Sequence, residues 1–316
     1  MNLHTNKELF TNALKAAATH FGIRDQFIEK DYWISYILYN LSKSEFAESV
    51  VFKGGTSLSK AHSLIDRFSE DVDIAVIGDS NNSPNKIKSI IREIEKKITD
   101  GLTEIELEGV TSKGSKYRKT VFQYPDIAEA NDNNQSVTIE INAFINPISF
   151  DQFQISSLIF QFLAYHGNTF EIGHYNLEPF SLNVLSKEQT LLEKIASLIR
   201  NSFDENFQLA LQSKIRHFYD LYYLMQDESC RKFVDDIDFK TDLLALINHD
   251  RAIFDDPTGW QQREVSDSPL IKDFENTWKL LQRRYESELK SLSYGEIPSS
   301  DLVFEMFTQL IIPKLN

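Results

Sequence analysis

The chain has 316 residues, of which 41% are hydrophobic and 25% are charged, as in ordinary folded proteins. Its 33 basic and 47 acidic residues give a formal net charge of −14, which excludes a general nucleic-acid-coating protein, because such proteins neutralise many phosphates. The apolar runs are too short to span a bilayer, and the polar start lacks a secretory stretch. The single cysteine allows no internal disulfide, so we expect a cytoplasmic protein without a membrane segment.

The chain begins with two helical patterns. Apolar residues recur at helical spacing over residues 6–21 and again over residues 25–41. Asp25 is a residue type that commonly caps a helix, so we expect it to cap the second helix.

A short apolar run at residues 49–53 predicts a strand that leads into Gly54-Gly55. Thr56 follows and is suited to cap a third helix that runs toward Asp66. The order is therefore a strand, a glycine pair and a helix.

Strand patterns continue after this helix. Asp71 to Val76 alternates acidic and apolar residues at period two, which predicts a strand. A basic amphipathic helix is expected at residues 87–98. Three further strands are expected at residues 104–109, 119–124 and 136–145, and polar segments at residues 78–85 and 128–135. A basic loop is expected between the strands at residues 104–109 and 119–124, with Lys113, Lys116, Arg118 and Lys119 as a candidate RNA contact.

The pattern becomes helical from Ser186 onward. Ser186 and Gln189 form a capping box ahead of an apolar run, and further helices are expected near residues 209–225 and 302–312. We therefore expect an α+β protein with two domains, residues 1–185 containing a mixed sheet and residues 186–316 being α-helical.

Three carboxylates are candidates for a metal site. Residues two apart in a strand point to the same face, so Asp71 and Asp73 project together. Glu140 lies centrally on a later alternating strand, where a third carboxylate would either bind a second metal ion or act as base toward the acceptor hydroxyl. Such oxygen ligands suit Mg²⁺ or Mn²⁺, and ions held there could polarise a phosphate and activate a hydroxyl.

The glycine pair is a candidate for phosphate binding. Glycines let the backbone approach phosphate oxygens closely, and Thr56 or Ser57 could donate hydroxyl hydrogen bonds. Taken separately, a glycine pair is usually a turn and an Asp-x-Asp strand is usually a solvated face. The order of strand, Gly-Gly-Thr, helix and Asp-x-Asp strand favours the functional interpretation.

The string from Phe52 to Lys60, the string from Arg67 to Ile74 and the upstream Ile28-Glu29-Lys30-Asp31-Tyr32-Trp33 resemble the AbiEii/AbiGii-type nucleotidyltransferase toxin family. This family belongs to the polymerase-β-like superfamily, and the resemblance covers roughly residues 26 to 225. It implies a polymerase-β-like nucleotidyltransferase domain with a mixed sheet followed by an α-helical domain. It also implies that the nucleotide is bound by Lys53, Gly54, Gly55, Thr56, Ser57, Arg67, Ser69 and Lys194.

Two later segments are similar to the family's later motifs. The segment Thr190 to Ile195 matches a Glu-Lys helix, from which Lys194 is expected to contact the nucleotide. The segment Lys214 to Leu221 matches an Arg-Asp-x-x-Asp-Leu motif, except that His217 replaces the first aspartate. Asp220 is retained and is expected to orient Lys194 or a substrate group. A structural ion pair between Lys194 and Asp220 is the alternative, and Arg67 is likewise divided between a triphosphate ligand and a partner for a carboxylate.

The resulting hypothesis is a Mg²⁺-dependent nucleotidyltransferase that moves a nucleoside monophosphate from an NTP to RNA. Asp71, Asp73, Glu140, Lys194 and Asp220 are its candidate catalytic residues, and the helical domain is expected to contribute to the active-site cleft. The resemblance implies a tRNA 3′ end as the acceptor and a role as the toxin of a toxin–antitoxin or phage-defence pair, with a cognate antitoxin as partner. The alternatives are a protein or small-molecule acceptor, or a non-catalytic nucleotide-binding module.

Overall fold

The computed structural model describes residues 1–69, 71–77, 83–114, 116–125, 127, 135–143 and 149–315. The chain forms two compact units. The first unit comprises Met1–Ser63 and Phe68–Leu185, and the second comprises Leu64–Arg67 and Ser186–Asn316. The chain therefore leaves the first unit for the short segment Leu64–Arg67, returns, and leaves it again after Leu185. The sequence pattern did not indicate this excursion.

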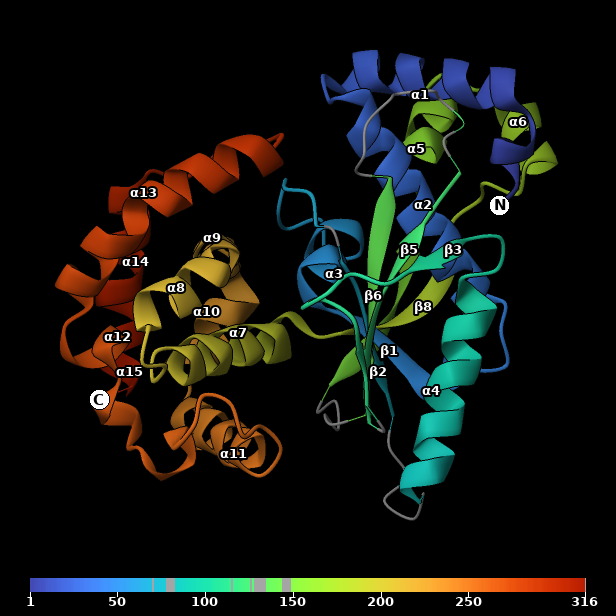
Figure 1. Ribbon diagram of the computed structural model, residues 1–316. Coiled ribbons are helices and arrows are strands. Elements are labelled where there is room, and N and C mark those ends of the chain that lie inside the picture. Colours follow the sequence, from blue (N-terminus) through green and yellow to red (C-terminus); the bar gives the residue numbers. More distant parts are fainter. Residues whose placement is uncertain are drawn as a thin grey trace. The chain divides into compact units, whose positions relative to one another are not determined.

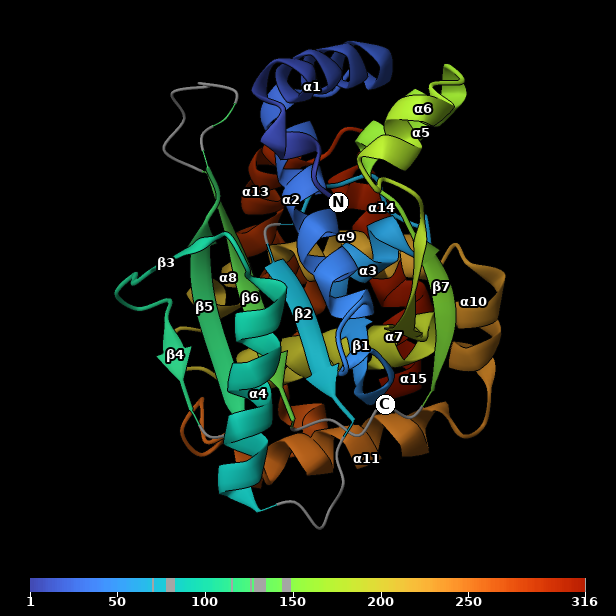
Figure 2. The same ribbon diagram turned by 90° about the vertical axis from the view of Figure 1, so that its right-hand side faces the viewer.

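The first unit is built on one mixed sheet, whose described part has eight strands (Figures 1 and 2). The strand order is β3-β5-β6-β2-β1-β8-β7, with β4 paired to β5. The pairs β1–β8 and β2–β6 are parallel, and the remaining pairs are antiparallel. This arrangement confirms the expected α+β class with a mixed sheet. The strands are β1 (Val50–Lys53), β2 (Asp71–Val76), β3 (Thr103–Ile105), β4 (Ser112–Lys113), β5 (Tyr117–Gln123), β6 (Ser136–Asn142), β7 (Phe150–Ile155) and β8 (Phe180–Leu185).

Helices α2 and α4 cover one face of this sheet (Figure 2). Alternate residues of β2 and β6, such as Ile74 and Ile139, are fully buried there and belong to one core cluster with Ile37 and Ile94. Their opposite neighbours on the same strands are half-buried and polar. The period-two pattern therefore separates a core face from a polar face. The helices of this unit are α1 (Lys7–Phe21), α2 (Asp25–Ser42), α3 (Gly54–Lys60), α4 (Pro84–Ile98), α5 (Leu158–Tyr165) and α6 (Thr169–His174).

The termini of the early helices follow local chemistry, with two corrections. The Asn6 side chain caps α1, and Gly22 ends it in the left-handed conformation. The prediction that Asp25 caps α2 is wrong, because Asp25 is the first helical residue and Arg24 precedes it without a side-chain cap. The prediction for Thr56 is also wrong, since α3 already begins at Gly54 and ends at Lys60 rather than near residue 66.

Further differences concern strand lengths and unpredicted elements. The strand expected at residues 104–109 is reduced to β3, and the strand expected from 119 begins earlier, as β5. The elements β7, α5, α6 and β8 had not been expected, because residues 150–185 mix strand and helix patterns in short stretches. Much of the polar segments expected at 78–85 and 128–135, and the end of the strand expected at 136–145, lie outside the described residues.

The second unit is helical, as expected for residues 186–316. Ser186 caps its first helix and accepts a hydrogen bond from the backbone of Gln189, which confirms the predicted cap. The helix expected at residues 209–225 is two helices that meet at Lys214, although the apolar spacing continues across the break. A π-helical turn, Phe307–Ile311, precedes the last helix. The helices are α7 (Lys187–Asn201), α8 (Phe207–Ser213), α9 (Ile215–Leu224), α10 (Glu228–Asp235), α11 (Phe239–Arg251), α12 (Pro269–Lys272), α13 (Phe274–Leu292), α14 (Ser300–Met306) and α15 (Ile312–Leu315).

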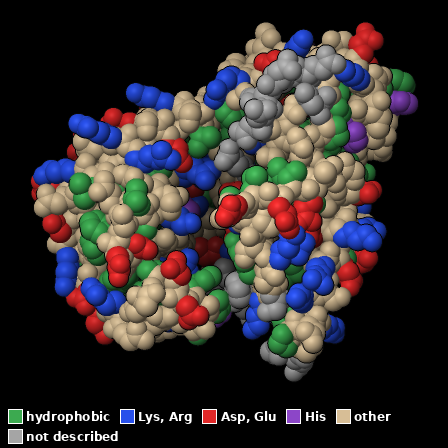
Figure 3. Space-filling view, in the orientation of Figure 1, with side chains coloured by type: hydrophobic (Ala, Val, Ile, Leu, Met, Phe, Trp, Pro, Cys, Tyr) green, Lys and Arg blue, Asp and Glu red, His purple; other side chains and the backbone are tan. Residues whose placement is uncertain are grey.

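Aromatic rings form much of the core of the helical unit. Phe218 of α9 lies 5.1 Å from Trp278 and 5.4 Å from Phe307, centroid to centroid. Trp278 of α13 also donates its indole N–H to the backbone of Ser300. On the surface drawn in Figure 3, acidic and basic side chains of this unit are interspersed. Among the described residues, no helix is both long and apolar enough to cross a membrane.

Candidate active site

A row of four charged residues crosses the polar face of the sheet. Strand pairing places Lys53 opposite Asp73, Asp73 opposite Glu140, and Glu140 opposite Lys119. Directly paired residues point to the same face, so the row runs cation, carboxylate, carboxylate, cation across β1, β2, β6 and β5. The structure thus brings Asp73 and Glu140 together on adjacent strands.

Asp71 lies on the same face as Asp73, one row closer to the start of β2, where it pairs with Thr138 of β6. Both aspartates and Glu140 are half-buried, whereas the intervening Val72 is fully buried on the other face. The sheet therefore holds three carboxylates side by side on a partly solvated surface.

These carboxylates repel one another. Burial, followed by the neighbouring charges of Glu140 and Asp71, raises the pKa of Asp73 to about 8. Lys53 and Lys119 oppose this rise without cancelling it. A cation that reaches the site would therefore favour the ionised form of Asp73.

Gly54 is fixed by its contact with Asp73. Its φ of +80° lies in the left-handed region, and a Cβ built on it would lie 2.1 Å from Oδ2 of Asp73. Both the backbone conformation and the space exclude any other residue without a shift of the carboxylate. The first glycine of the pair therefore lets the start of α3 pass directly beside the carboxylate.

The hydroxyls after the glycine pair are already engaged. Thr56 donates to the backbone oxygen of Asp71, and Ser57 donates to that of Gly54 at 2.9 Å. Both side chains are buried, as is Ser69. The Thr56 contact holds the first turn of α3 against β2, and a phosphate contact through either hydroxyl hydrogen would have to replace one of these bonds. The roles predicted for Gly55, Thr56, Ser57 and Ser69 at the nucleotide stay predictions.

The motif at residues 28–33 includes Asp31, which contacts the last residue of helix α3. The carboxylate of Asp31 in α2 accepts a hydrogen bond from Nζ of Lys60 at 2.5 Å. It also accepts one from the backbone N–H of Leu158 at 2.7 Å. Asp31 and Lys60 both lie within strings that carry the family resemblance. The ion pair ties the end of α3 to α2 and to the start of α5, and so positions the glycine pair at the helix's other end.

The carboxylates have the chemistry of a magnesium site. Within the described part of the chain, no three His, Cys, Asp or Glu side chains are arranged to hold a metal ion. Mg²⁺ is commonly bound by one or two carboxylates, with substrate phosphates and water completing its shell, so a preformed three-residue site is not required. Asp71 and Asp73 fit this mode, because their mutual repulsion is relieved by a cation.

Lys194 and Asp220 meet within the helical unit. Nζ of Lys194 lies 2.6 Å from Oδ2 of Asp220, and Arg67 makes two hydrogen bonds to the same carboxylate, at 2.7 and 2.6 Å. All three side chains are buried, with 6%, 0% and 3% exposure for Lys194, Asp220 and Arg67. The alternative of a structural ion pair is thus present in the structure, and it includes Arg67. The expected nucleotide roles of Lys194 and Arg67 stay predictions.

Electrostatics within this cluster are set by its excess positive charge. Burial by itself would raise the pKa of Asp220, but Arg67 and Lys194 outweigh burial and hold it below its usual value. Burial, and next the charge of Lys194, lowers the pKa of His217 well below its ordinary range, so its imidazole is neutral. The residue at the family's aspartate position therefore adds no negative charge, and the group carries a net positive charge.

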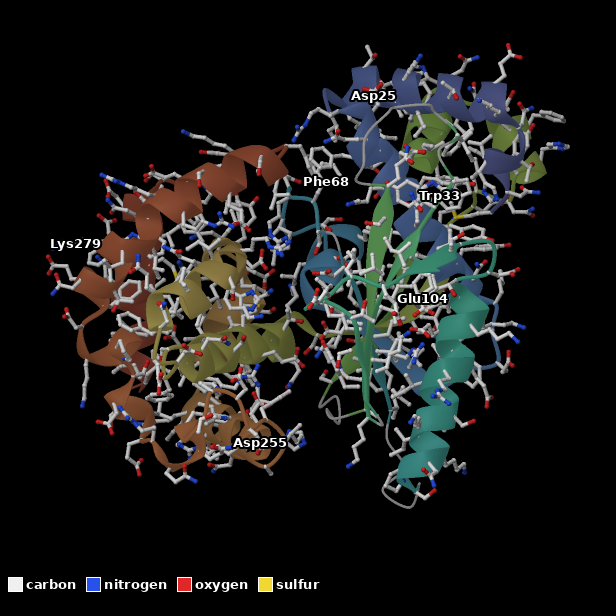
Figure 4. The ribbon with its side chains drawn as sticks, in the orientation of Figure 1. Asp25, Trp33, Phe68, Glu104, Asp255 and Lys279 are labelled. Carbon is white, nitrogen blue, oxygen red and sulfur yellow. The ribbon has the colours of Figure 1, made fainter. Side chains whose placement is uncertain are left out.

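The prediction of a basic loop at residues 113–119 is wrong. These residues lie mainly in β4 and β5, and Lys113 pairs with Glu104 (Figure 4) at 2.7 Å and with Glu106 at 2.9 Å. Arg118 pairs with the buried Glu95 of α4, on the sheet face opposite Lys119. The basic residues are thus divided between two faces and largely ion-paired, a pairing that depends on strand register.

The sequence interpretation missed two residues beside Glu140. Asn142 lies two residues beyond Glu140 on β6 and pairs with Tyr117 of β5, whose pKa is raised by burial and next by the charge of Glu140. The alternation of β6 had already placed Asn142 on the polar face with Glu140. Tyr117 could be placed only once the register between β5 and β6 was known.

Comparison with solved structures shows a similar fold over almost the whole chain. MenT4, a nucleotidyltransferase toxin from Mycobacterium tuberculosis H37Rv, superposes with a TM-score of 0.52 at 16% sequence identity, covering 95% of this chain and 91% of that one. A search of curated proteins gave no match.

The profile of the family described as "Nucleotidyl transferase AbiEii toxin, Type IV TA system" matches residues 36–306. This span contains the glycine pair, the three carboxylates and the cluster around Asp220. Membership implies an NTP substrate and an antitoxin counterpart. The chain belongs to the AbiEii nucleotidyltransferase toxin family of type IV toxin–antitoxin systems.

Proposed function

We propose that this nucleotidyltransferase toxin moves a nucleoside monophosphate from an NTP to the 3′ end of an RNA, with tRNA as the acceptor, and that Mg²⁺ or Mn²⁺ supports the reaction. The observation that carries the proposal is the transverse row of Lys53, Asp73, Glu140 and Lys119, with Gly54 lying against the Asp73 carboxylate. Carboxylates that could bind a metal ion would thus lie beside the start of α3, where a phosphate could approach the backbone.

Each part of the site has a separate chemical task. Asp71 and Asp73 would hold the divalent ion, and the backbone at Gly54-Gly55 would receive the triphosphate. A bound ion would neutralise charge on the reacting phosphates. Glu140 lies one strand further from the glycine pair, where it can accept the proton of the attacking hydroxyl.

The helical unit contains a buried cluster with an excess of positive charge. Arg67 and Lys194 together exceed Asp220 by one charge, and the neutral His217 does not reduce the excess. That excess supports a role for Lys194 toward an anionic nucleotide. We retain the roles of Lys194 and Asp220 toward the nucleotide as part of the proposal.

A protein or small-molecule acceptor is the second candidate. Two observations favour it, namely the formal net charge of −14 and the ion pairing of most basic residues near the sheet. RNA approaching such a chain needs a local basic surface, because the overall field repels it.

Labelled NTPs incubated with total tRNA and Mg²⁺ test the proposal. Asp71→Asn or Asp73→Asn should reduce transfer on the order of 10²-fold or more, because each removes a ligand for the charge-neutralising ion. Asp151→Asn is the matched control, since Asp151 is an exposed aspartate on β7 of the same sheet. Label on protein rather than on tRNA would select the second candidate, and undiminished transfer by the folded Asp73 variant would refute the site.

A further inference from the structure

The polar face of the sheet continues beyond Glu140, on the side away from the glycine pair. The next transverse row consists of Ala75, Asn142 and Tyr117, carried by β2, β6 and β5. Lys119 of β5 completes the surroundings of Glu140 in the preceding row. These side chains belong to the first unit. Tyr117 and Asn142 were not predicted as site residues, whereas Lys119 was predicted as an RNA contact.

Glu140 faces two groups from β5. Nζ of Lys119 lies 3.5 Å from its carboxylate, and burial, followed by the charge of Glu140, raises the pKa of the Tyr117 hydroxyl. One group comes from the residue directly opposite Glu140 and the other from two residues earlier on the same strand. The carboxylate is therefore flanked by β5, on the side opposite to β2 and its aspartates.

Asn142 is a buried amide with an unused acceptor. The residue is only 6% exposed, and its Oδ1 accepts no hydrogen bond from any part of the chain that the structure describes. Leaving such an oxygen buried without a partner costs stability, and hydrophobic residues would serve a purely structural role better. The Asn142 side chain projects from the same face of β6 as Glu140, two residues and about 7 Å further along the strand.

The order of strands separates two substrates. Gly54 and Lys53 lie at the end of β1, on one side of the pair β2–β6, whereas Tyr117 and Lys119 lie on the other side, in β5. The triphosphate is assigned to the β1 side by the glycine pair. The β5 side is therefore left for the acceptor.

Resting on the proposed function, we infer that Tyr117, Lys119 and Asn142 form the acceptor subsite, in which Asn142 binds the 2′-hydroxyl of a terminal ribose. Tyr117 and Lys119 are positioning residues that direct Glu140 toward the neighbouring 3′-hydroxyl. The 3′ oxygen forms a bond to the α-phosphorus of the NTP, the bond from that phosphorus to the bridging oxygen breaks, and pyrophosphate leaves. The proton of the 3′-hydroxyl passes to Glu140.

A ribose hydroxyl suits this amide in particular. A hydroxyl both donates and accepts, so it can pair with either end of the Asn142 carboxamide. The 2′- and 3′-hydroxyls of a ribose are adjacent, so a contact to one orients the other. The 2′-hydroxyl is also the group by which a protein distinguishes RNA from DNA at a given position.

The test compares two oligonucleotide acceptors that differ only in a terminal ribose or 2′-deoxyribose that keeps its 3′-hydroxyl. The wild-type protein should favour the ribose acceptor about ten-fold in kcat/KM. This is the effect expected when the deoxyribose acceptor lacks one well-formed hydrogen bond. Asn142→Ala should abolish the preference, so that the ribose and deoxyribose acceptors react with the same kcat/KM. Asn183→Ala is the matched control, because Asn183 is equally buried in the same sheet but donates to the backbone of Ala47 and Val50.

Persistent discrimination by a folded Asn142→Ala protein would overturn the assignment of Asn142. A wild-type protein that uses both acceptors equally would overturn it without any variant, whereas a wild-type protein that modifies no RNA would overturn the proposed function itself. For the positioning residues, Lys119→Met should lower kcat on both acceptors alike, and Lys119→Arg should restore it. An unchanged kcat in Lys119→Met would remove Lys119 from the subsite.

Discussion

The cluster of Arg67, Lys194 and Asp220 allows a sharp test of whether Lys194 is a structural or a nucleotide-binding residue. Lys194→Met keeps most of the side chain's volume and removes its charge. Asp220 then retains the two hydrogen bonds from Arg67, at 2.7 and 2.6 Å, so no charge is left alone. The expected loss is that of a charged hydrogen bond, about 1.5–3 kcal/mol of unfolding free energy.

Asp220→Ala is a more severe change. It leaves two buried cations, Arg67 and Lys194, without their carboxylate, and breaking a buried pair in this way costs about 3–5 kcal/mol. The stabilising contribution of Asp220 should be present above the ordinary aspartate pKa. It should be lost as the pH falls toward the lowered pKa of the folded state, because the native carboxylate must then take up a proton.

The assay is denaturant and thermal unfolding, set beside the KM for NTP. At about 2–4 °C per kcal/mol, Lys194→Met should lower the Tm by about 3–12 °C. Lys279→Met is the matched control, because Lys279 on α13 (Figure 4) makes a lysine–carboxylate pair of 2.7 Å whose partners are 58% and 69% exposed. Such an exposed pair is worth only about 0.3–0.5 kcal/mol.

Equal losses of stability in Lys194→Met and Lys279→Met would refute the structural account of the cluster. An unchanged Tm together with a raised KM for NTP would instead make Lys194 a nucleotide ligand. A double-mutant cycle of Lys194→Met with Asp220→Asn then gives the coupling free energy directly.

Three further changes have clear expected outcomes. Gly54→Ala should lose nucleotidyl transfer, because the new Cβ displaces the Asp73 carboxylate. Gly22 has a similar positive φ but no neighbour within 4 Å of a built Cβ, so Gly22→Ala should keep the activity. Equal activity of the two variants would contradict the proposed importance of the Gly54 contact. In the absence of divalent ions, the Tm of Asp73→Asn should rise relative to that of the wild type as the pH increases from 5 to 8. The raised pKa of Asp73 makes the wild-type native state lose stability over that range, and a Tm difference that does not change with pH would rule this out. Arg118→Met should destabilise the sheet unit by several kcal/mol in denaturant unfolding, since it leaves the carboxylate of Glu95 buried, and RNA transfer per folded molecule should be unchanged; a fall in RNA binding at full stability would return Arg118 to an RNA-contacting role.

The sequence by itself determined the elements that carry the candidate site residues. Period-two alternation placed Asp71 and Asp73 on one face of a strand and Glu140 on the polar face of another, because alternation in a strand is a local property of the chain. The strings around Gly54-Gly55 and Asp71 were specific enough to indicate the family. The capping box at Ser186 marked the start of the helical part for the same local reason.

Only the tertiary structure decided which residues are neighbours across strands and helices. A row of partners such as Asp73, Glu140 and Lys119 depends on strand order and register, which a one-residue slip would reverse. Register also separated Arg118 from Lys119, so that a cluster in sequence became two residues on opposite faces. The excursion that joins Arg67 to Asp220 links positions far apart in the chain. Local patterns cannot determine such contacts, because their geometry is set by the packing of whole elements rather than by the residues beside them.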